Sequence, residues 1–303
     1  MHACGHDAHT AMLMGAAEVL SGMRSKIPGT VLFLFQPSEE ERPNDEAAGA
    51  ELMLAEGALD DPAPSAIFGL HVAPFAPGMI GIRSGPIMAA QETFTVTLTG
   101  RQVHGSMPWA GVDLIPLAGE ITAALGRIPA SQVDMLRGPT VLSIGRIRGG
   151  AAANVIPGEV EFEGTMRSLD DQNRKAAIAA IERTVSGMAA AGGASAKVVF
   201  KKGYPVTNND PSLTESALPI LRKVAGPPGV QQIPPLLAAE DFSYYQQRIP
   251  GVYYFLGVAP EGAAPEAAFP NHSDRFAVNE ACLRYGVEAH VRLALHHLGG
   301  TLE

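Results

Sequence analysis

The feature that most constrains the fold is an alternation of helical and short apolar strand patterns, which a different pattern interrupts once. Residues 8–23 are rich in strong helix formers. The apolar run 30–35 (TVLFLF) then predicts a buried strand, and a helix over 47–56 and a second apolar strand over 65–71 follow. Helices that alternate with buried strands are typical of a parallel α/β sheet.

The pattern changes between residues 90 and 202. Residues 92–100 (ETFTVTLTG) alternate polar and apolar side chains, which predicts a half-exposed antiparallel strand. The elements expected after it are a helix over 113–127, strands over 140–147 and 159–167, a helix over 170–190 and a strand over 196–202. This βαββαβ order is the ferredoxin-like pattern. Because its terminal elements are adjacent strands, such a unit can be inserted into another domain.

The α/β pattern resumes after residue 202. We expect a helix over 211–225, a buried strand over 252–258 and a last helix from Asn279 to about residue 298. The predicted fold class is therefore α/β, with one domain formed by residues 1–89 and 203–303 and a ferredoxin-like domain of residues 90–202 inserted into it.

The composition excludes several classes of protein. Charged residues make up 17% of the 303 residues, the net charge is −9, and no run of Lys or Arg occurs, which argues against nucleic acid or an anionic membrane as a partner. The longest apolar run, 31–35, is too short to span a bilayer, and no secretory signal is visible. Cys4 and Cys282 give no disulfide framework. These features favour a soluble cytoplasmic protein.

The first nine residues, MHACGHDAH, concentrate groups that bind metals. The ordinary interpretation is an exposed chain end, since terminal residues are often poorly ordered. The alternative is half of a metal site, with Cys4 and His6 as ligands in the loop that leads into the first helix. A site needs about four ligands per metal, so this alternative requires further ligands downstream.

Further candidate ligands follow the predicted strands. Glu39–Glu41 come after the first apolar strand, His71 ends the second, and His272 lies in a long loop. Ligands of α/β sheets bind outside the carboxyl ends of the strands. With Cys4 and His6 these residues form a set too large for one tetrahedral zinc with an open position, and it suits two metals that share a bridging ligand. Zinc, manganese, cobalt and nickel all accept such mixed donors.

Seven segments of the sequence carry a family resemblance. They are MHACGHDAHTAMLMGAA, GTVLFLFQPSEE, AIFGLHV, GPIMAA, ANVIPGEVEFEGTMR, AAEDFSYY and NHSDRF. Together they resemble the metal-dependent amidohydrolases of the hippurate hydrolase, indole-acetyl-amino-acid hydrolase and N-acyl-amino-acid deacylase group. That group is a branch of the aminoacylase/carboxypeptidase metallopeptidase superfamily.

The resemblance implies an activity and a ligand set. The activity is hydrolysis of the amide bond of N-acyl or N-aroyl amino acids, with two divalent metal ions as cofactors. The catalytic carboxylate falls on Glu39, and the thiolate of Cys4 has the bridging role. The implied ligands are Cys4, His6, Glu40, His71 and His272.

The resemblance also assigns a role to the inserted domain. It implies a lid that forms the interface of a homodimer, in which His104 reaches the partner's active site and steadies the oxyanion. Asn154 and Arg167 match polar lid positions that we expect near the substrate carboxylate. From the residues alone, His104 would be a surface loop residue.

Two alternatives stay open at this point. A dipeptidase or carboxypeptidase would use the same site. In the family, the CGHDAH motif follows an N-terminal segment that supplies sheet strands and an Asp-bearing loop, whereas this sequence begins at the methionine of the motif. We therefore expect uncovered apolar edges, and the second alternative is a truncated remnant that only binds metal and dimerises.

Overall fold

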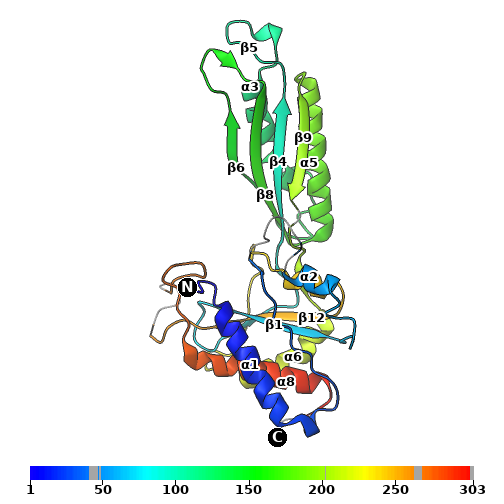
Figure 1. Ribbon diagram of the computed structural model, residues 1–303, viewed down its shortest axis with the longest axis vertical. Helices are drawn as coiled ribbons and strands as arrows, with labels where there is room; N and C mark the ends of the chain where they lie inside the picture. Colours follow the sequence, from blue (N-terminus) through cyan, green and yellow to red (C-terminus); the bar gives the residue numbers. More distant parts are fainter. Residues whose placement is uncertain (41–46, 48, 202, 263–267, 301–303) are drawn as a thin grey trace. The chain divides into compact units, whose positions relative to one another are not determined.

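The computed structural model describes residues 1–40, 47, 49–201, 203–262 and 268–300. The chain forms two compact units (Figure 1). Unit 1 contains residues 1–87, 207–235 and 241–303, and unit 2 contains residues 88–206 and 236–240. The mixed α/β class predicted from the sequence is confirmed.

Unit 1 combines a small sheet with helices. Its helices are α1 (His6–Gly22), η1 (Arg24–Lys26), α2 (Gly49–Ala55), α6 (Pro211–Val224), α7 (Phe242–Gln246), η5 (Glu280–Cys282) and α8 (Leu283–His297). Its strands are β1 (Ile67–Ala73), β2 (Ile80–Ile82), β3 (Gly85–Met88), β10 (Thr207–Asn209), β11 (Val230–Gln232) and β12 (Gly251–Gly257). Most predicted helices are therefore present within a few residues of their expected ends.

The main sheet of unit 1 has the strand order β1-β12-β2-β11. Strand β1 pairs in parallel with β12, from Ile67 opposite Gly251 to Ala73 opposite Gly257. The parallel pairing expected for the predicted strands 65–71 and 252–258 is therefore present, whereas β2, which was not predicted, runs antiparallel to β12 and makes the sheet mixed. The reason is the short connection 74–79, because a parallel return needs a crossover of a dozen or more residues.

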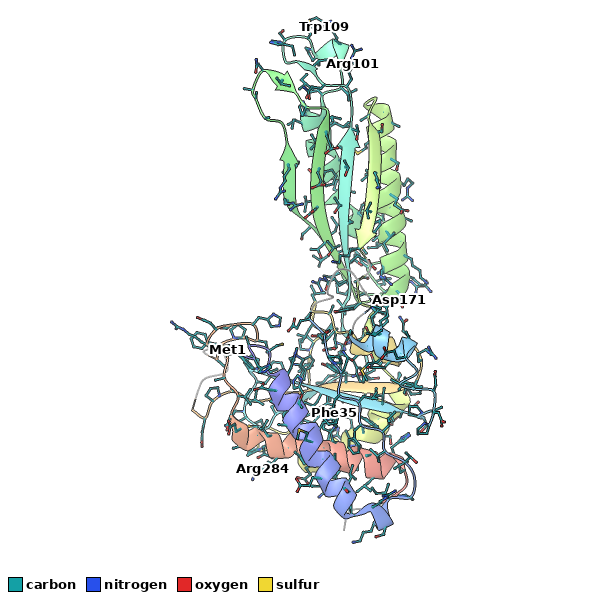
Figure 2. All side chains as sticks on the ribbon, in the orientation of Figure 1. Met1, Phe35, Arg101, Trp109, Asp171 and Arg284 are labelled. Atoms are coloured by element: carbon teal, nitrogen blue, oxygen red, sulfur yellow. The ribbon has the colours of Figure 1, made fainter. Side chains whose placement is uncertain are left out.

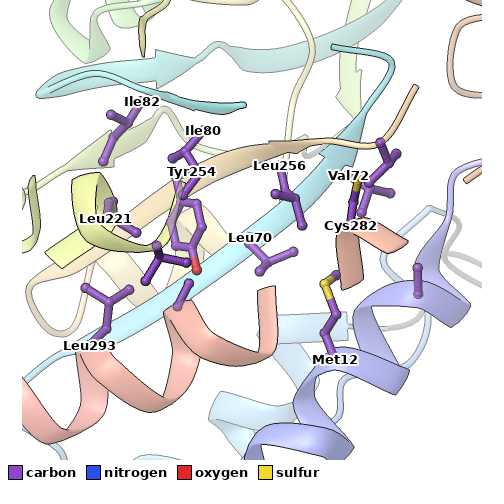
Figure 3. Packing of buried hydrophobic residues seen from close by; sticks show 14 of the residues in the cluster. Met12, Leu70, Val72, Ile80, Ile82, Leu221, Tyr254, Leu256, Cys282 and Leu293 are labelled. Atoms are coloured by element: carbon purple, nitrogen blue, oxygen red, sulfur yellow. The ribbon is translucent and has the colours of Figure 1, made fainter. Parts of the chain in front are cut away.

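Strand β12 is buried along its whole length because both faces of the sheet are covered. Tyr254 belongs to the core that includes Leu221 of α6 and Leu293 of α8 (Figure 3). The neighbouring Tyr253 points to the other face and packs on Phe242 of α7, with 4.9 Å between the ring centroids. This alternation explains why the strand reads as a continuous apolar run.

The segment 30–35 does not form the buried strand that its composition predicts. Val31 and Phe33 pack against a small cluster between α1 and α8, whereas Leu32 is 40% exposed and Phe35 is 47% exposed. A strand needs a hydrogen-bonded neighbour, and no strand among the described residues pairs with this segment. The strand predicted for residues 30–35 from their apolar composition is therefore wrong.

Unit 2 has the predicted βαββαβ order. Its main elements are β4 (Ala90–Thr99), α3 (Leu114–Leu125), α4 (Ile128–Ser131), β6 (Thr140–Gly149), β8 (Glu159–Ser168), α5 (Asp171–Ala191) and β9 (Ser195–Lys201). The sheet order is β6-β8-β4-β9, with antiparallel pairing throughout. Apolar side chains of this sheet, such as Phe94 and Phe162, form a core with Ile121 of α3 and Ile181 of α5.

A short ribbon extends one end of unit 2. It consists of β5 (Val103–His104) paired with β7 (Val155–Ile156). The short helix η3 (Pro108–Ala110) comes directly after β5 in the chain. Figure 2 labels Arg101 and Trp109 at this end of unit 2 and Asp171 at the opposite end. The side chain of Trp109 is 80% exposed.

Candidate metal centre

The predicted ligands come from four separate segments of unit 1. Cys4 lies in the loop before α1, and His6 is the first residue of that helix. Glu40 follows the irregular segment 30–38, and His71 lies near the end of β1. His272 lies in the loop before η5.

Cys4 is at the centre of these groups. Its Sγ lies 3.4 Å from Nε2 of His71 and 3.2 Å from Nε2 of His272. The potential ligand atoms of Cys4, His6 and His71 all lie within 4.8 Å of one another, and so do those of Cys4, Glu40 and His272. Two three-residue groups thus share one thiol, which is the arrangement that two ions with a common bridging ligand require.

Both acidic residues of the QPSEE motif border this cluster. Nε2 of His6 lies 3.9 Å from a carboxylate oxygen of Glu39 and 3.9 Å from one of Glu40. Nε2 of His272 lies 3.0 Å from Oε1 of Glu40. Glu39 and Glu40 therefore approach the same imidazole from adjacent positions. Glu41 lies outside the described residues.

Backbone conformation brings the loops together. Gly5 has φ of 82°, and a Cβ at this position would lie 2.4 Å from a methyl carbon of Val72, so only glycine lets the Cys4 loop pack against β1. His272 also has a positive φ of 69°. Its backbone N–H donates to the carbonyl of Ala3 at 2.7 Å, which ties the two ligand-bearing loops together.

A hydrogen-bond network that sequence reasoning missed anchors the segment before Glu39. The side-chain amide of Gln36 donates to both carboxylate oxygens of the buried Asp241, at 2.8 Å each. The N–H of Ala50 donates to the same carboxylate, and the hydroxyl of Tyr245 donates to Oε1 of Gln36 at 3.0 Å. Gln36 lies in the QPSEE motif and Asp241 in the AAEDF motif. Their presence in these motifs is the only feature of the sequence that could have indicated this hydrogen-bond network.

In the metal-free protein, the electrostatics of the cluster act in opposite directions on the pKa of the thiol and on the pKa values of two imidazoles. Burial, with the nearby charge of Glu40, raises the pKa of the Cys4 thiol to about 12. Burial lowers the pKa of His6 and of His71, so both imidazoles are neutral near pH 7, the form that binds metals. Thiol sulfur, imidazole nitrogen and carboxylate oxygen together fit zinc, manganese, cobalt or nickel.

A cavity of about 310 Å³ adjoins the cluster. It is lined by residues 1–3 together with Cys4, His6, Glu40 and His272. Its volume is at the lower end of the range for small-molecule sites. All candidate ligands except His71 therefore border a space of the size that a small substrate needs.

The predicted lid residues all belong to unit 2. His104 lies on the ribbon and Asn154 directly precedes its second strand, where the N–H of Gly105 donates to the carbonyl of Asn154 at 2.7 Å. The N–H of Ser106 donates to Nδ1 of His104 at 3.2 Å. Because Nδ1 accepts this bond, the proton of a neutral His104 ring is on Nε2.

Arg167 does not lie on the ribbon. It is opposite Gln91 near the far end of the ten-residue strand β8, and its Nη1 donates to Oε1 of Gln91 at 2.9 Å. Burial lowers the pKa of its guanidinium from the ordinary value. The two residues expected near the substrate carboxylate, Asn154 and Arg167, thus lie on different parts of unit 2.

Comparisons with known proteins identify a family for the chain. Residues 1–296 match the model of peptidase family M20/M25/M40. Thermostable carboxypeptidase 2 of Saccharolobus solfataricus is 38% identical over 297 residues, which cover 97% of this chain and 73% of that protein. The N-acyl-L-amino acid amidohydrolase of Geobacillus stearothermophilus is 42% identical over 212 residues, which cover 69% of this chain and 55% of that protein.

The fold is also similar to a solved structure. The crystal structure of a dinuclear metal-binding peptidase of the M20 family from Bacillus subtilis superposes with a TM-score of 0.80 and 32% identity, covering 99% of this chain and 74% of that one. The fold and the site together define a hydrolase of the metallopeptidase type, built on a mixed α/β fold.

The chain belongs to peptidase family M20/M25/M40. The resemblance stated from the motifs and the predicted class of enzyme, a metal-dependent amidohydrolase, are confirmed. Among the described residues, no helix is both long and apolar enough to cross a membrane.

Proposed function

We propose that this protein hydrolyses the amide bond of N-acyl or N-aroyl amino acids at a centre of two divalent metal ions. The observation that carries the proposal is the position of Cys4, which is shared by two three-residue groups of candidate ligands in unit 1. In this proposal His6 and His71 complete one site, Glu40 and His272 complete the other, and Cys4 bridges them.

The chemistry of the donor set supports two ions. The dinuclear metal binding described for the Bacillus subtilis peptidase supports the same number. The ions, when bound, would supply positive charge that polarises a substrate carbonyl and makes water more acidic. Their identity among manganese, zinc, cobalt and nickel is left open by the ligand types.

Glu39 is the proposed general base. It adjoins the proposed ligand Glu40, and its carboxylate lies 3.9 Å from His6. The carboxylates of Glu39 and Glu40 lie within 4.8 Å of each other beside His6, so one glutamate can bind metal while the other takes a proton from the attacking water. Glu39 then gives this proton to the leaving amine.

His104 is the proposed donor to the oxyanion of the partner subunit's site. The backbone N–H of Ser106 donates to Nδ1 of His104, which leaves the proton of the neutral ring on Nε2. The side chain of His104 is exposed on the ribbon. An N–H aimed at a developing oxyanion stabilises the transition state. The proposal requires a homodimer through unit 2, in which Asn154 approaches with His104 because the two share the ribbon. Arg167 is proposed separately as a contact for the substrate carboxylate.

The experiment that tests the function measures metal content and hydrolysis on the same preparation. N-acetyl amino acids, hippurate and dipeptides are offered as substrates, and the products are identified. The proposal predicts about two ions per chain and turnover of N-acyl amino acids. Two ions without turnover of any substrate would instead support the remnant that only binds metal and dimerises.

A second candidate function is that of a carboxypeptidase or dipeptidase with the same site. It is favoured by the carboxypeptidase relatives from Saccharolobus solfataricus, of 38% and 37% identity. Preferential release of amino acids from dipeptides would support this candidate. A cytoplasmic location remains a prediction from the composition.

A further inference from the structure

Val72, next to the proposed ligand His71, has unusual partners for both of its backbone polar groups. Its N–H donates to Nε2 of His9 at 3.0 Å. Its carbonyl accepts hydrogen bonds from Nδ1 of His71 at 2.7 Å and from the side-chain amide of Asn271 at 3.1 Å. Among the described residues, β1 is at the edge of its sheet, so these side chains take the place of a neighbouring strand.

The bond from His71 to Val72 decides which nitrogen of His71 faces Cys4. Because Nδ1 donates to the carbonyl, Nε2 carries the lone pair, and this atom lies 3.4 Å from Sγ of Cys4. The position of the Val72 carbonyl therefore sets the direction in which His71 presents its ligand atom. A group that holds Val72 in place also holds His71.

His9 holds the N–H side of Val72. It lies one helical turn after His6 on α1, and its ring centroid is 4.6 Å from that of His71 and 5.3 Å from that of His6. Nε2 of His9 is already occupied as an acceptor for the Val72 N–H. This third histidine of the CGHDAH motif thus connects the first helix to the end of β1.

Asn271 holds the carbonyl side. Its Nδ2 is 3.1 Å from the carbonyl oxygen of Val72 and 3.1 Å from that of Cys4, and it is 3.9 Å from the Cys4 sulfur. An amide nitrogen has two hydrogens, so it can serve both carbonyls at once. Asn271 therefore joins the loop of His272 to the loop of Cys4 and to β1.

We propose that His9 and Asn271 are positioning residues of the metal centre, which orient His71 and Cys4 through the backbone of Val72 and of Cys4. The inference rests on the proposed metal centre and assigns roles to two residues that bind no ion in it. Groups that orient metal ligands typically contribute about 10- to 100-fold to metal affinity. His9→Leu and Asn271→Ala should lose affinity in this range.

The test titrates Co²⁺ into the metal-free full chain and follows both affinity and the visible spectrum. His9→Leu and Asn271→Ala should bind Co²⁺ more weakly and with an altered spectrum, since the ligand geometry changes. His9→Gln keeps a side-chain acceptor for the Val72 N–H and should recover most of the affinity. His296→Gln is the matched control, because His296 is exposed on α8 and contacts Ser216. Urea unfolding of each metal-free variant measures any purely structural effect.

Wild-type affinity and spectrum in both His9→Leu and Asn271→Ala would overturn the inference. The inference would also be overturned if the metal-free variants fold with a lower free energy of unfolding but still give the wild-type Co²⁺ spectrum. This result would indicate that the two residues have a structural role alone. If His9→Leu does not fold, Asn271→Ala and His9→Gln decide the question. A wild-type chain that binds no Co²⁺ would overturn the proposed metal centre itself, and this outcome is seen before any variant is compared.

Discussion

The thiol of Cys4 contacts the imidazole of His272, with 3.2 Å between Sγ and Nε2, although 268 positions separate the two residues in the chain. The contact is supported by the backbone bond from His272 to Ala3. It links the first loop of the chain to the loop before the last helix. The proposed bridging role of Cys4 depends on this contact and on the one with His71.

The shared position of Cys4 predicts unequal effects of ligand substitutions on metal content. His272→Ala and His71→Ala each remove a ligand from one site, so each variant should retain about one ion per chain. Cys4→Ala removes a donor from both sites and should weaken the binding of both ions. Elemental analysis after dialysis measures the metal content. Loss of a single ion in Cys4→Ala would contradict the bridging role.

The raised pKa of Cys4 predicts that metal affinity increases with pH. The thiol, with a pKa raised to about 12, holds its proton near neutrality, whereas the thiolate is the ligand. His6 and His71, with lowered pKa values, are already neutral and release no proton. Affinity should therefore increase about tenfold per pH unit, with one proton released from Cys4. Calorimetry in buffers of different ionisation enthalpy counts that proton, and a pH-independent affinity would contradict the assignment.

Glu39→Gln should retain metal but lose about 10²- to 10⁴-fold or more in kcat, because the amide cannot take a proton from water. Steady-state kinetics and metal analysis on the same sample measure both quantities. Glu56→Gln is the matched control, since Glu56 is exposed at the end of α2. Near-normal kcat in Glu39→Gln would rule out its role as the base.

The proposed role of His104 in the partner's site predicts complementation. A mixture of inactive Glu39→Gln and His104→Ala chains forms mixed dimers with one intact site. After subunit exchange at equal concentrations, about a quarter of the wild-type activity should return, as random pairing of a twofold dimer requires. No activity after demonstrated exchange would show that His104 does not act in the partner's site.

Tyr254→Phe should stabilise the protein by about 1 kcal/mol, because the buried hydroxyl has no hydrogen-bond partner among the residues that the structure describes. The ring lies in the core of unit 1, so its packing is retained by phenylalanine (Figure 3). Urea unfolding of the metal-free protein measures the difference. Clear destabilisation would mean that the hydroxyl makes a stabilising bond to buried water.

Sequence periodicity predicted most of the fold because the relevant interactions are local or depend on one face of an element. The helix over 170–190 and the strand over 159–167 agree with α5 and β8 within one residue. The apolar segment 30–35 was misjudged, because apolar composition does not show whether a strand has a hydrogen-bonded neighbour. The three-residue strand β2 was not predicted, because so short a segment has no readable periodicity.

The sequence by itself determined the chemical types of the candidate ligands, their places at loops and strand ends, and the family through its motifs. Only the tertiary structure decided that Cys4 lies between His71 and His272, and that His9 and Asn271 hold Val72. It also separated Arg167 from Asn154 along unit 2. The physical reason is that ligand geometry depends on contacts between segments far apart in the chain, whereas residue types and periodicity are local properties.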